Sequence, residues 1–145
     1  MQSMAMSKHD KQTCNNVRYF FNHDFEKYKQ LAELADLKTV SYDGINSSTN
    51  INHQENKVVT ASYYQNIVDT VKKVIDRIQD ERYKKLLIYR HFEHLSFWQV
   101  AQRMQYGETT VKALINQAYL LFADMLAVVT DIDLRKDDYI ETDKH

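Results

Sequence analysis

Apolar side chains recur with helical spacing over most of this chain. In residues 16–36 they lie three and four positions apart, which predicts an amphipathic helix with Asn15 or Asn16 as its N-cap. The apolar stripe comprises Val17, Phe21, Tyr28, Leu31 and Ala35, widened by Phe20, Phe25 and Leu34. Residues 1–15 are polar and aperiodic, so we expect them to form a disordered leader.

A polar segment separates this helix from a second helical region. Residues 37–59 are rich in Ser, Thr, Asn and Asp, whose side chains hydrogen-bond to nearby backbone and favour turns, so we expect a linker. Residues 60–130 return to helical spacing. They open with a heptad-spaced seam formed by Tyr64, Ile67, Val71, Val74 and Ile78. The seam either packs within the chain or joins two copies as a homodimer.

The most informative local pattern lies in residues 95–126. Ser96 is followed three positions later by Gln99, a capping box that predicts the start of a helix. A short turn containing Gly107 then leads into a longer helix. Its expected core stripe comprises Val111, Ile115, Ala118, Phe122, Met125 and Val129. A short helix, a tight turn and a longer helix are typical of the DNA-binding helix-turn-helix, and also of an ordinary helical hairpin.

Composition supports an all-α fold. The chain has 145 residues, no proline and only two glycines, whereas β-rich proteins need many turn residues. We therefore predict a helical bundle with a C-terminal helix-turn-helix, an N-terminal helix joined by a polar linker, and a frayed acidic tail over 131–145. With no signal peptide or transmembrane run recognised in the sequence, we expect a cytoplasmic protein with no membrane partner.

Charge and candidate chemistry narrow the function classes. A formal net charge of −1 excludes a histone-like protein, although a local basic face can still bind DNA. The single cysteine, Cys14, excludes an intramolecular disulfide. His91 and His94 lie three residues apart, but no third ligand has a fitting position, so we expect surface histidines and no metal. No pattern indicates an enzyme or a cofactor.

The segment "LLIYRHFEHLSFWQVAQRMQYGETTVKALINQAY" resembles the fourth region of bacterial sigma factors. With "WQV", "LLFAD" and the N-terminal "FEKYKQLAELA", the chain more closely resembles ArpU-type regulators of phages over residues 16–126. The resemblance implies a regulator of transcription that binds double-stranded DNA in a bacterial host cell, of the kind associated with late genes of prophages. Two departures stand out: Gln105 occupies the usual glycine position at the helix exit, and the second helix lacks the family's arginines.

The face of the second helix opposite its core stripe is polar and weakly charged. Asn and Gln can pair with adenine, and the methyl groups of Thr and Ala can contact thymine. The candidate base-reading residues are Thr109, Thr110, Lys112, Ala113, Asn116 and Gln117. The candidate phosphate-binding residues are Arg103, Lys84, Lys85 and Arg90. Alternatives are a sigma-like adaptor that binds RNA polymerase or another protein, a DNA-recognition subunit of phage packaging, and a structural helical protein.

Overall fold

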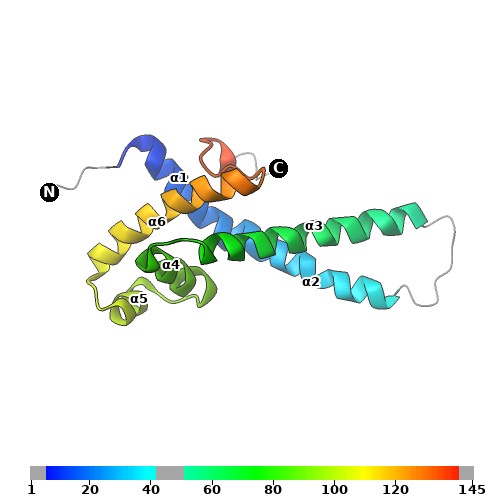
Figure 1. The fold of residues 1–145 in the computed structure, drawn as a ribbon, viewed down its shortest axis with the longest axis horizontal. Helices are drawn as coiled ribbons and strands as arrows, with labels where there is room; N and C mark the ends of the chain where they lie inside the picture. Colours follow the sequence, from blue (N-terminus) through cyan, green and yellow to red (C-terminus); the bar gives the residue numbers. More distant parts are fainter. Residues whose placement is uncertain (1–5, 42–50, 141–145) are drawn as a thin grey trace.

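The computed structural model describes residues 6–41 and 51–140, and the backbone alone over 35–41 and 51–61. All regular secondary structure in these ranges is helical, which confirms the all-α prediction. The first helix, α1 (Lys8–Tyr19), continues through a π-helical turn, η1 (Phe20–Asp24), into α2 (Phe25–Ser41). Helix α3 (Ile51–Asp76) runs back along α2, and the two form a long hairpin that projects from the rest of the molecule (Figure 1).

The remaining elements form the body of the molecule. Helix α4 (Glu81–Leu87) continues into a second π-helical turn, η3 (Ile88–Phe92). The next two helices are α5 (Phe97–Met104) and α6 (Glu108–Val129). Helix α6 contacts α1, α3, α4 and α5, and it crosses α1 in the body (Figure 1).

A single hydrophobic cluster holds these elements together. The π-helical turn η1 supplies Phe20 and Phe21, and α2 supplies Phe25, all almost completely buried. Their rings lie against Phe122 of α6, whose ring centroid is 5.0 Å from that of Phe21 and 6.2 Å from that of Phe20. The predicted amphipathic face therefore packs in the core at Val17 and these phenylalanines, whereas Leu34 is 49% exposed.

The predicted leader is wrong from Lys8 onward, because α1 begins there and lies against the core. Its cap is Ser7, whose Oγ accepts a hydrogen bond from the Asp10 N–H at 3.0 Å, and not Asn15 or Asn16. The buried residues of its N-terminal half are Thr13 and Cys14. Because these side chains are polar or small, the buried face of α1 leaves no apolar periodicity in the sequence. Residues 1–5 of the predicted leader lie outside the described residues.

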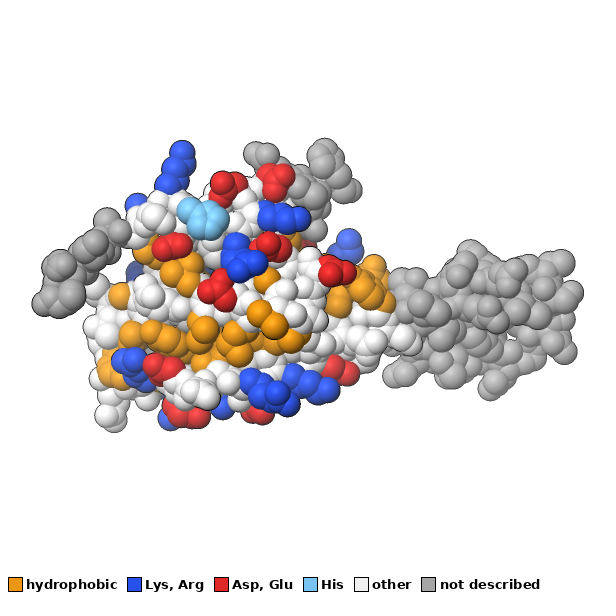
Figure 2. All heavy atoms as spheres, turned by 45° about the horizontal axis from the view of Figure 1, so that its top comes forward, with side chains coloured by type: hydrophobic (Ala, Val, Ile, Leu, Met, Phe, Trp, Pro, Cys, Tyr) orange, Lys and Arg blue, Asp and Glu red, His pale blue; other side chains and the backbone are white. Residues whose placement is uncertain are grey.

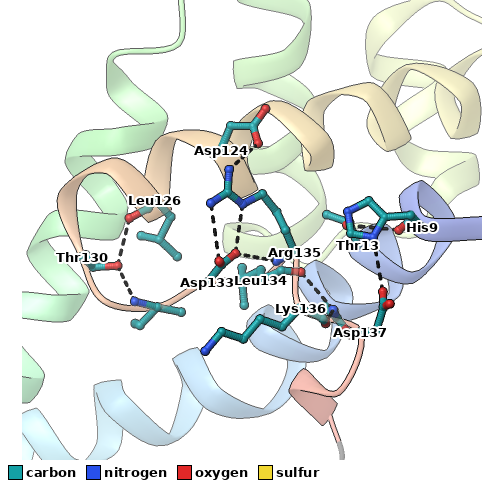
Figure 3. Close-up of polar contacts among 12 residues, drawn as sticks. His9, Thr13, Asp124, Leu126, Thr130, Asp133, Leu134, Arg135, Lys136 and Asp137 are labelled. Carbon is teal, nitrogen blue, oxygen red and sulfur yellow. Dashed lines mark hydrogen bonds and ion pairs between the residues drawn. The ribbon is translucent and has the colours of Figure 1, made fainter.

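The predicted frayed tail is also wrong over residues 131–140. Leu134 is completely buried, and Asn16 donates from Nδ2 to the backbone oxygens of Leu134 at 2.9 Å and Lys136 at 2.7 Å. Figure 3 shows Arg135 beside Asp133 and Asp124, at 2.9 Å and 3.3 Å. The hydroxyl of Tyr139 donates to the carboxylate of the buried Asp24. Hydrogen bonds and an ion pair therefore hold the tail against both α1 and α6. Residues 141–145 lie outside the described residues.

The linker is shorter than predicted, whereas the seam packs as one of the two alternatives predicted. Helices occupy both ends of the predicted linker 37–59, since α2 extends to Ser41 and α3 begins at Ile51, and residues 42–50 lie outside the described residues. The seam packs within the chain. Its four aliphatic members are buried, and the Tyr64 ring stacks on that of Tyr28 at 5.4 Å. The intrachain alternative is thus confirmed for the seam.

Helix α6 is long and apolar enough, by length and composition alone, to cross a membrane. Seven of its residues are buried in the protein core, as expected for the central helix of a bundle. The predicted core stripe holds from Val111 to Phe122, and Met125 is half-buried. The stripe fails at Val129, which is 57% exposed. The helix therefore keeps an apolar surface near its C-terminal end.

We predict that replacing Asn16 with alanine releases the tail. The substitution leaves two partly or fully buried carbonyls without their donor, and we expect a loss of about 1–3 kcal/mol in the free energy of unfolding. Urea denaturation measures this loss, and amide exchange over residues 131–140 should quicken. The control is Asn22→Ala, at an exposed position of η1, with an expected change of less than about 0.5 kcal/mol. Equal effects from the two variants would contradict this role of Asn16.

Candidate nucleic-acid interface

Helix α5 begins where the sequence predicts. The Ser96 Oγ accepts a hydrogen bond from the Gln99 N–H at 3.1 Å, and the Gln99 Oε1 accepts one from the Ser96 N–H at 2.9 Å. This reciprocal pair confirms the predicted capping box. Val100 and Ala101 are buried, and the small Ala101 side chain allows α5 to pack closely on its neighbours. The box and the buried pair together fix the start and the inward face of α5.

The turn between α5 and α6 has a defined geometry. Gln105 has a φ of 60° and a ψ of 40°, the left-handed conformation that usually belongs to glycine. The N–H of Tyr106 donates to the Ala101 oxygen at 3.1 Å, and that of Gln105 to the Gln102 oxygen at 3.3 Å. This is a Schellman motif. Gly107 has a negative φ and caps α6 without a side chain, with nothing within 4 Å of the position its Cβ would take. The left-handed conformation in this turn therefore lies at Gln105 and not at Gly107.

The first turns of α6 present most of the predicted base-reading residues to solvent. Those on the open face are Thr109, Thr110, Lys112, Ala113 and Gln117. Among the described residues, no hydrogen bond or ion pair engages these five side chains. The Lys112 ammonium lies 5.4 Å from the centroid of the Phe97 ring, so α5 supports its position.

Asn116 does not share this open face. Its Oδ1 accepts a hydrogen bond from Arg18 Nη2 at 3.3 Å, and its backbone oxygen lies 3.5 Å from the Cys14 thiol. The prediction that Asn116 is freely available is therefore wrong. The physical reason is α1: Cys14, which was assigned to the leader, and Arg18, which was assigned to the helix after it, both lie against this side of α6. The same contact brings Arg18 and the exposed Asn15 beside the site, where sequence analysis did not place them.

The predicted phosphate-binding residues fall into two groups. Arg103 pairs with Glu93 at 3.0 Å and Lys84 pairs with Glu81 at 3.5 Å, so carboxylates partly neutralise both. The hydrogen bond that Arg103 donates to the Glu93 carboxylate raises the pKa of Arg103. Arg90 donates to the Leu95 oxygen at 2.9 Å and lies 4.3 Å from the centroid of the Phe97 ring. Lys85 is exposed and has no ion pair among the described residues.

The Phe97 ring lies beside two of the candidate DNA-binding cations. Arg90 from η3 and Lys112 from α6 both lie over its ring, which links the phosphate-binding and base-reading candidates through α5. From residue 80 to residue 117 the chain has six Lys or Arg and four Asp or Glu, a net charge of +2. Three of the six cations are in ion pairs, including Arg82 with Asp80. The positive field at this surface is therefore modest.

Two exposed aromatic side chains, one on α5 and one in the turn, were not expected at the surface from the sequence. Trp98 on α5 is 60% exposed and Tyr106 in the turn is 36% exposed. Trp98 shares its side of α5 with the exposed side chains of Gln102 and Gln105. The outer face of α5 is thus neutral and carries an open aromatic ring.

A buried polar pair supports α6 from within. The Nε2 atom of His91 and the hydroxyl of Tyr119 are 2.8 Å apart, and the His91 ring stacks on Phe21 at 4.4 Å. Burial, with a smaller contribution from Arg90, lowers the pKa of His91 to about 3. Burial also raises the pKa of Tyr119 to about 12. His91 is therefore a neutral core residue, and the prediction of a surface histidine is wrong.

Comparison of the chain with known protein families, curated proteins and solved structures gives no match. The resemblance to ArpU-type regulators and to the fourth sigma region therefore stays a prediction.

We predict that Gln105→Gly stabilises the protein. A left-handed conformation costs a non-glycine residue about 1–2 kcal/mol, which glycine largely avoids, so we expect a gain of about 1 kcal/mol in the free energy of unfolding. The matched control is Gln102→Gly in the same helix, where glycine should cost about 1 kcal/mol. Urea denaturation of both variants checks the opposite signs, and two losses of similar size would refute the proposed conformation of Gln105.

We also predict that His91 makes stability depend on pH. Its folded pKa lies below the unfolded value of about 6.5, so the unfolded chain binds more protons between these values and stability falls as pH drops through this window. Between pH 7 and pH 5 the residue should account for about 2 kcal/mol of lost stability.

The measurement compares the unfolding free energy of the wild type and His91→Gln at these two pH values. The variant should lose less stability on acidification, because glutamine does not titrate. His23→Gln, at an exposed histidine, serves as the control and should follow the wild type. A His91→Gln variant with the same pH dependence as the wild type would show that His91 is not the responsible group.

Proposed function

We propose that the chain is a sequence-specific DNA-binding protein that regulates transcription in a bacterial host cell, of the type that controls late genes of prophages. In this proposal α5 and α6 form a helix-turn-helix, and α6 enters the major groove. One observation carries it. The first turns of α6 expose a set of short, unengaged side chains directly after a well-capped α5 and a three-residue turn. Such a set is poorly suited to packing but well suited to contact with base edges.

The chemistry of the exposed side chains favours A·T base pairs. The side-chain amide of Gln117 can donate a hydrogen bond to N7 of adenine and accept one from its amino group. The methyl groups of Thr109 and Ala113 can contact the methyl group of thymine. Each bidentate contact of this kind discriminates by about 1–3 kcal/mol. In this arrangement Asn116 does not touch bases, because Arg18 holds its side-chain oxygen.

Phosphate contacts would come from the cations without carboxylate partners. These are Lys112, Lys85 and Arg90, with Arg18 of α1 at the edge of the same surface. Each phosphate neutralised by a cation releases counterions and contributes a slope of about −0.9 in a plot of log affinity against log salt concentration. With so few free cations, we expect a shallow slope and specificity that depends largely on base contacts.

We predict that Gln117→Ala weakens binding to the specific duplex by roughly 5- to 150-fold, because one bidentate base contact is lost. Fluorescence anisotropy with labelled duplexes from the chain's own genomic locus identifies the specific site and measures this change. Binding to a scrambled duplex should stay the same. Gln30→Ala, at an exposed position of α2, is the matched control and should bind like the wild type.

Lys112→Ala tests the phosphate contacts in the same assay. It should weaken binding to every duplex and reduce the salt slope by about one, the signature of a lost phosphate contact. The proposal is abandoned if the wild type prefers no duplex from the locus, or if Gln117→Ala and Lys112→Ala both bind like the wild type.

One observation favours a second candidate function, a sigma-like adaptor that binds RNA polymerase or another protein. The outer face of α5 is neutral and exposes 60% of Trp98, and aromatic side chains are enriched at protein interfaces. An adaptor would capture RNA polymerase without DNA, and Trp98→Ala would abolish that capture while leaving duplex binding unchanged. The DNA-binding proposal predicts that capture requires DNA.

A further inference from the structure

An apolar groove runs between α3 and the C-terminal end of α6, on the opposite end of α6 from the proposed DNA contacts. It consists of two adjoining hollows of about 290 and 360 Å³, which share Thr70 and Val129 in their walls. Figure 2 shows a continuous apolar strip on this side of the molecule, with Lys and Arg side chains gathered along part of one edge and acidic and basic side chains mixed beyond the other. The groove thus combines an apolar floor with charged margins.

The apolar exposure at this groove is concentrated. Three of the large hydrophobic side chains with substantial exposure lie along it: Tyr63 at 57%, Val128 at 83% and Val129 at 57%. The spacing that buries the first part of α6 continues through Met125 to Val129, but the chain itself covers only the first part. The apolar spacing of α6 therefore continues for about one helical turn beyond the part that the single chain buries.

The charges at the margins are complementary between two copies. Lys73 and Arg77 line the α3 side of the groove, and Asp131 lies just beyond the end of α6 on the other side. Among the described residues no ion pair involves any of these three. Within one chain the neighbouring acid Asp124 is already paired with Arg135 (Figure 3). The unpaired cations and the unpaired carboxylate are thus open to a partner.

We propose that this groove is the interface of a two-fold homodimer. A two-fold contact must be self-complementary, so that each surface meets the same surface of the other copy. In the dimer, Val128 of each chain enters the groove of its partner, and Asp131 of each chain faces the partner's Lys73 and Arg77. The heptad seam is already buried within the chain, and only Ile67 and Val74 from its edge contribute to the walls of the groove.

Sedimentation velocity of the full chain tests this proposal directly. The wild type should sediment with twice the monomer mass at micromolar concentration. Val128→Lys should be monomeric, because the dimer would bury an ammonium group beside the partner's Lys73 and Arg77. This position is 83% exposed in the single chain, so the fold should remain, as checked by circular dichroism and thermal unfolding. Leu34→Lys, at another exposed apolar position, is the matched control and should still dimerise.

Charge reversal provides a second, independent readout. Lys73→Glu and Asp131→Lys should each weaken the dimer by roughly tenfold, because the attraction between residues 73 and 131, which occurs twice in a two-fold dimer, becomes repulsion. The double variant should dimerise more tightly than either single variant, since both copies of this pair are restored with exchanged signs while Arg77 is unchanged. The proposal is overturned by a wild type that remains monomeric at high concentration or forms a larger ring, by a dimeric Val128→Lys, or by a double variant that is no tighter than the single variants. None of these measurements requires DNA, so they stand apart from the test of DNA binding.

Discussion

Tyr119 and Phe122 lie in the middle of α6, and both are completely buried. Four helices contact α6 along its length: α1 and α3 from the N-terminal half of the chain, and α4 and α5 from the C-terminal half. An apolar helix of this length can leave water only if other elements cover several of its sides at once. Its burial therefore determines where the other helices lie. It also fixes the direction in which the exposed first turns of α6 project.

Polar contacts inside this apolar packing make the arrangement specific. Asn16 holds the returning tail, His91 meets Tyr119 beneath α6, and Tyr139 reaches the buried Asp24. Each contact satisfies a group that would cost free energy if it were buried alone. A helix that rotated or slid by one residue would break them, whereas apolar contacts tolerate small shifts. Cys14 and Arg18 likewise hold α1 against Asn116 of α6, so Asn116 is covered while Gln117 stays open.

Sequence could predict the elements whose physical causes are local. The capping box at Ser96 and Gln99 correctly placed the start of α5, and the seam around Val71 correctly marked a buried helix face. Sequence failed where burial is polar or comes from distant partners. Helix α1 buries Thr13 and Asn16, which carry no apolar signal, and Leu134 is buried only because the chain returns to α1. The site was likewise only partly predictable, because the ion pair of Arg103 with Glu93 depends on how η3 and α5 meet.

The two proposals support each other through electrostatics. A single chain offers few unpaired cations near α6, so its phosphate contacts alone would give only weak binding to any duplex. A two-fold dimer doubles both the phosphate contacts and the base contacts on one DNA molecule, and the second contact then occurs at a high effective concentration. Joining the chains at the C-terminal ends of α6 leaves both N-terminal ends free, as binding to a palindromic site requires. A weakly charged helix can therefore serve specific DNA binding, provided that two copies act on the same site.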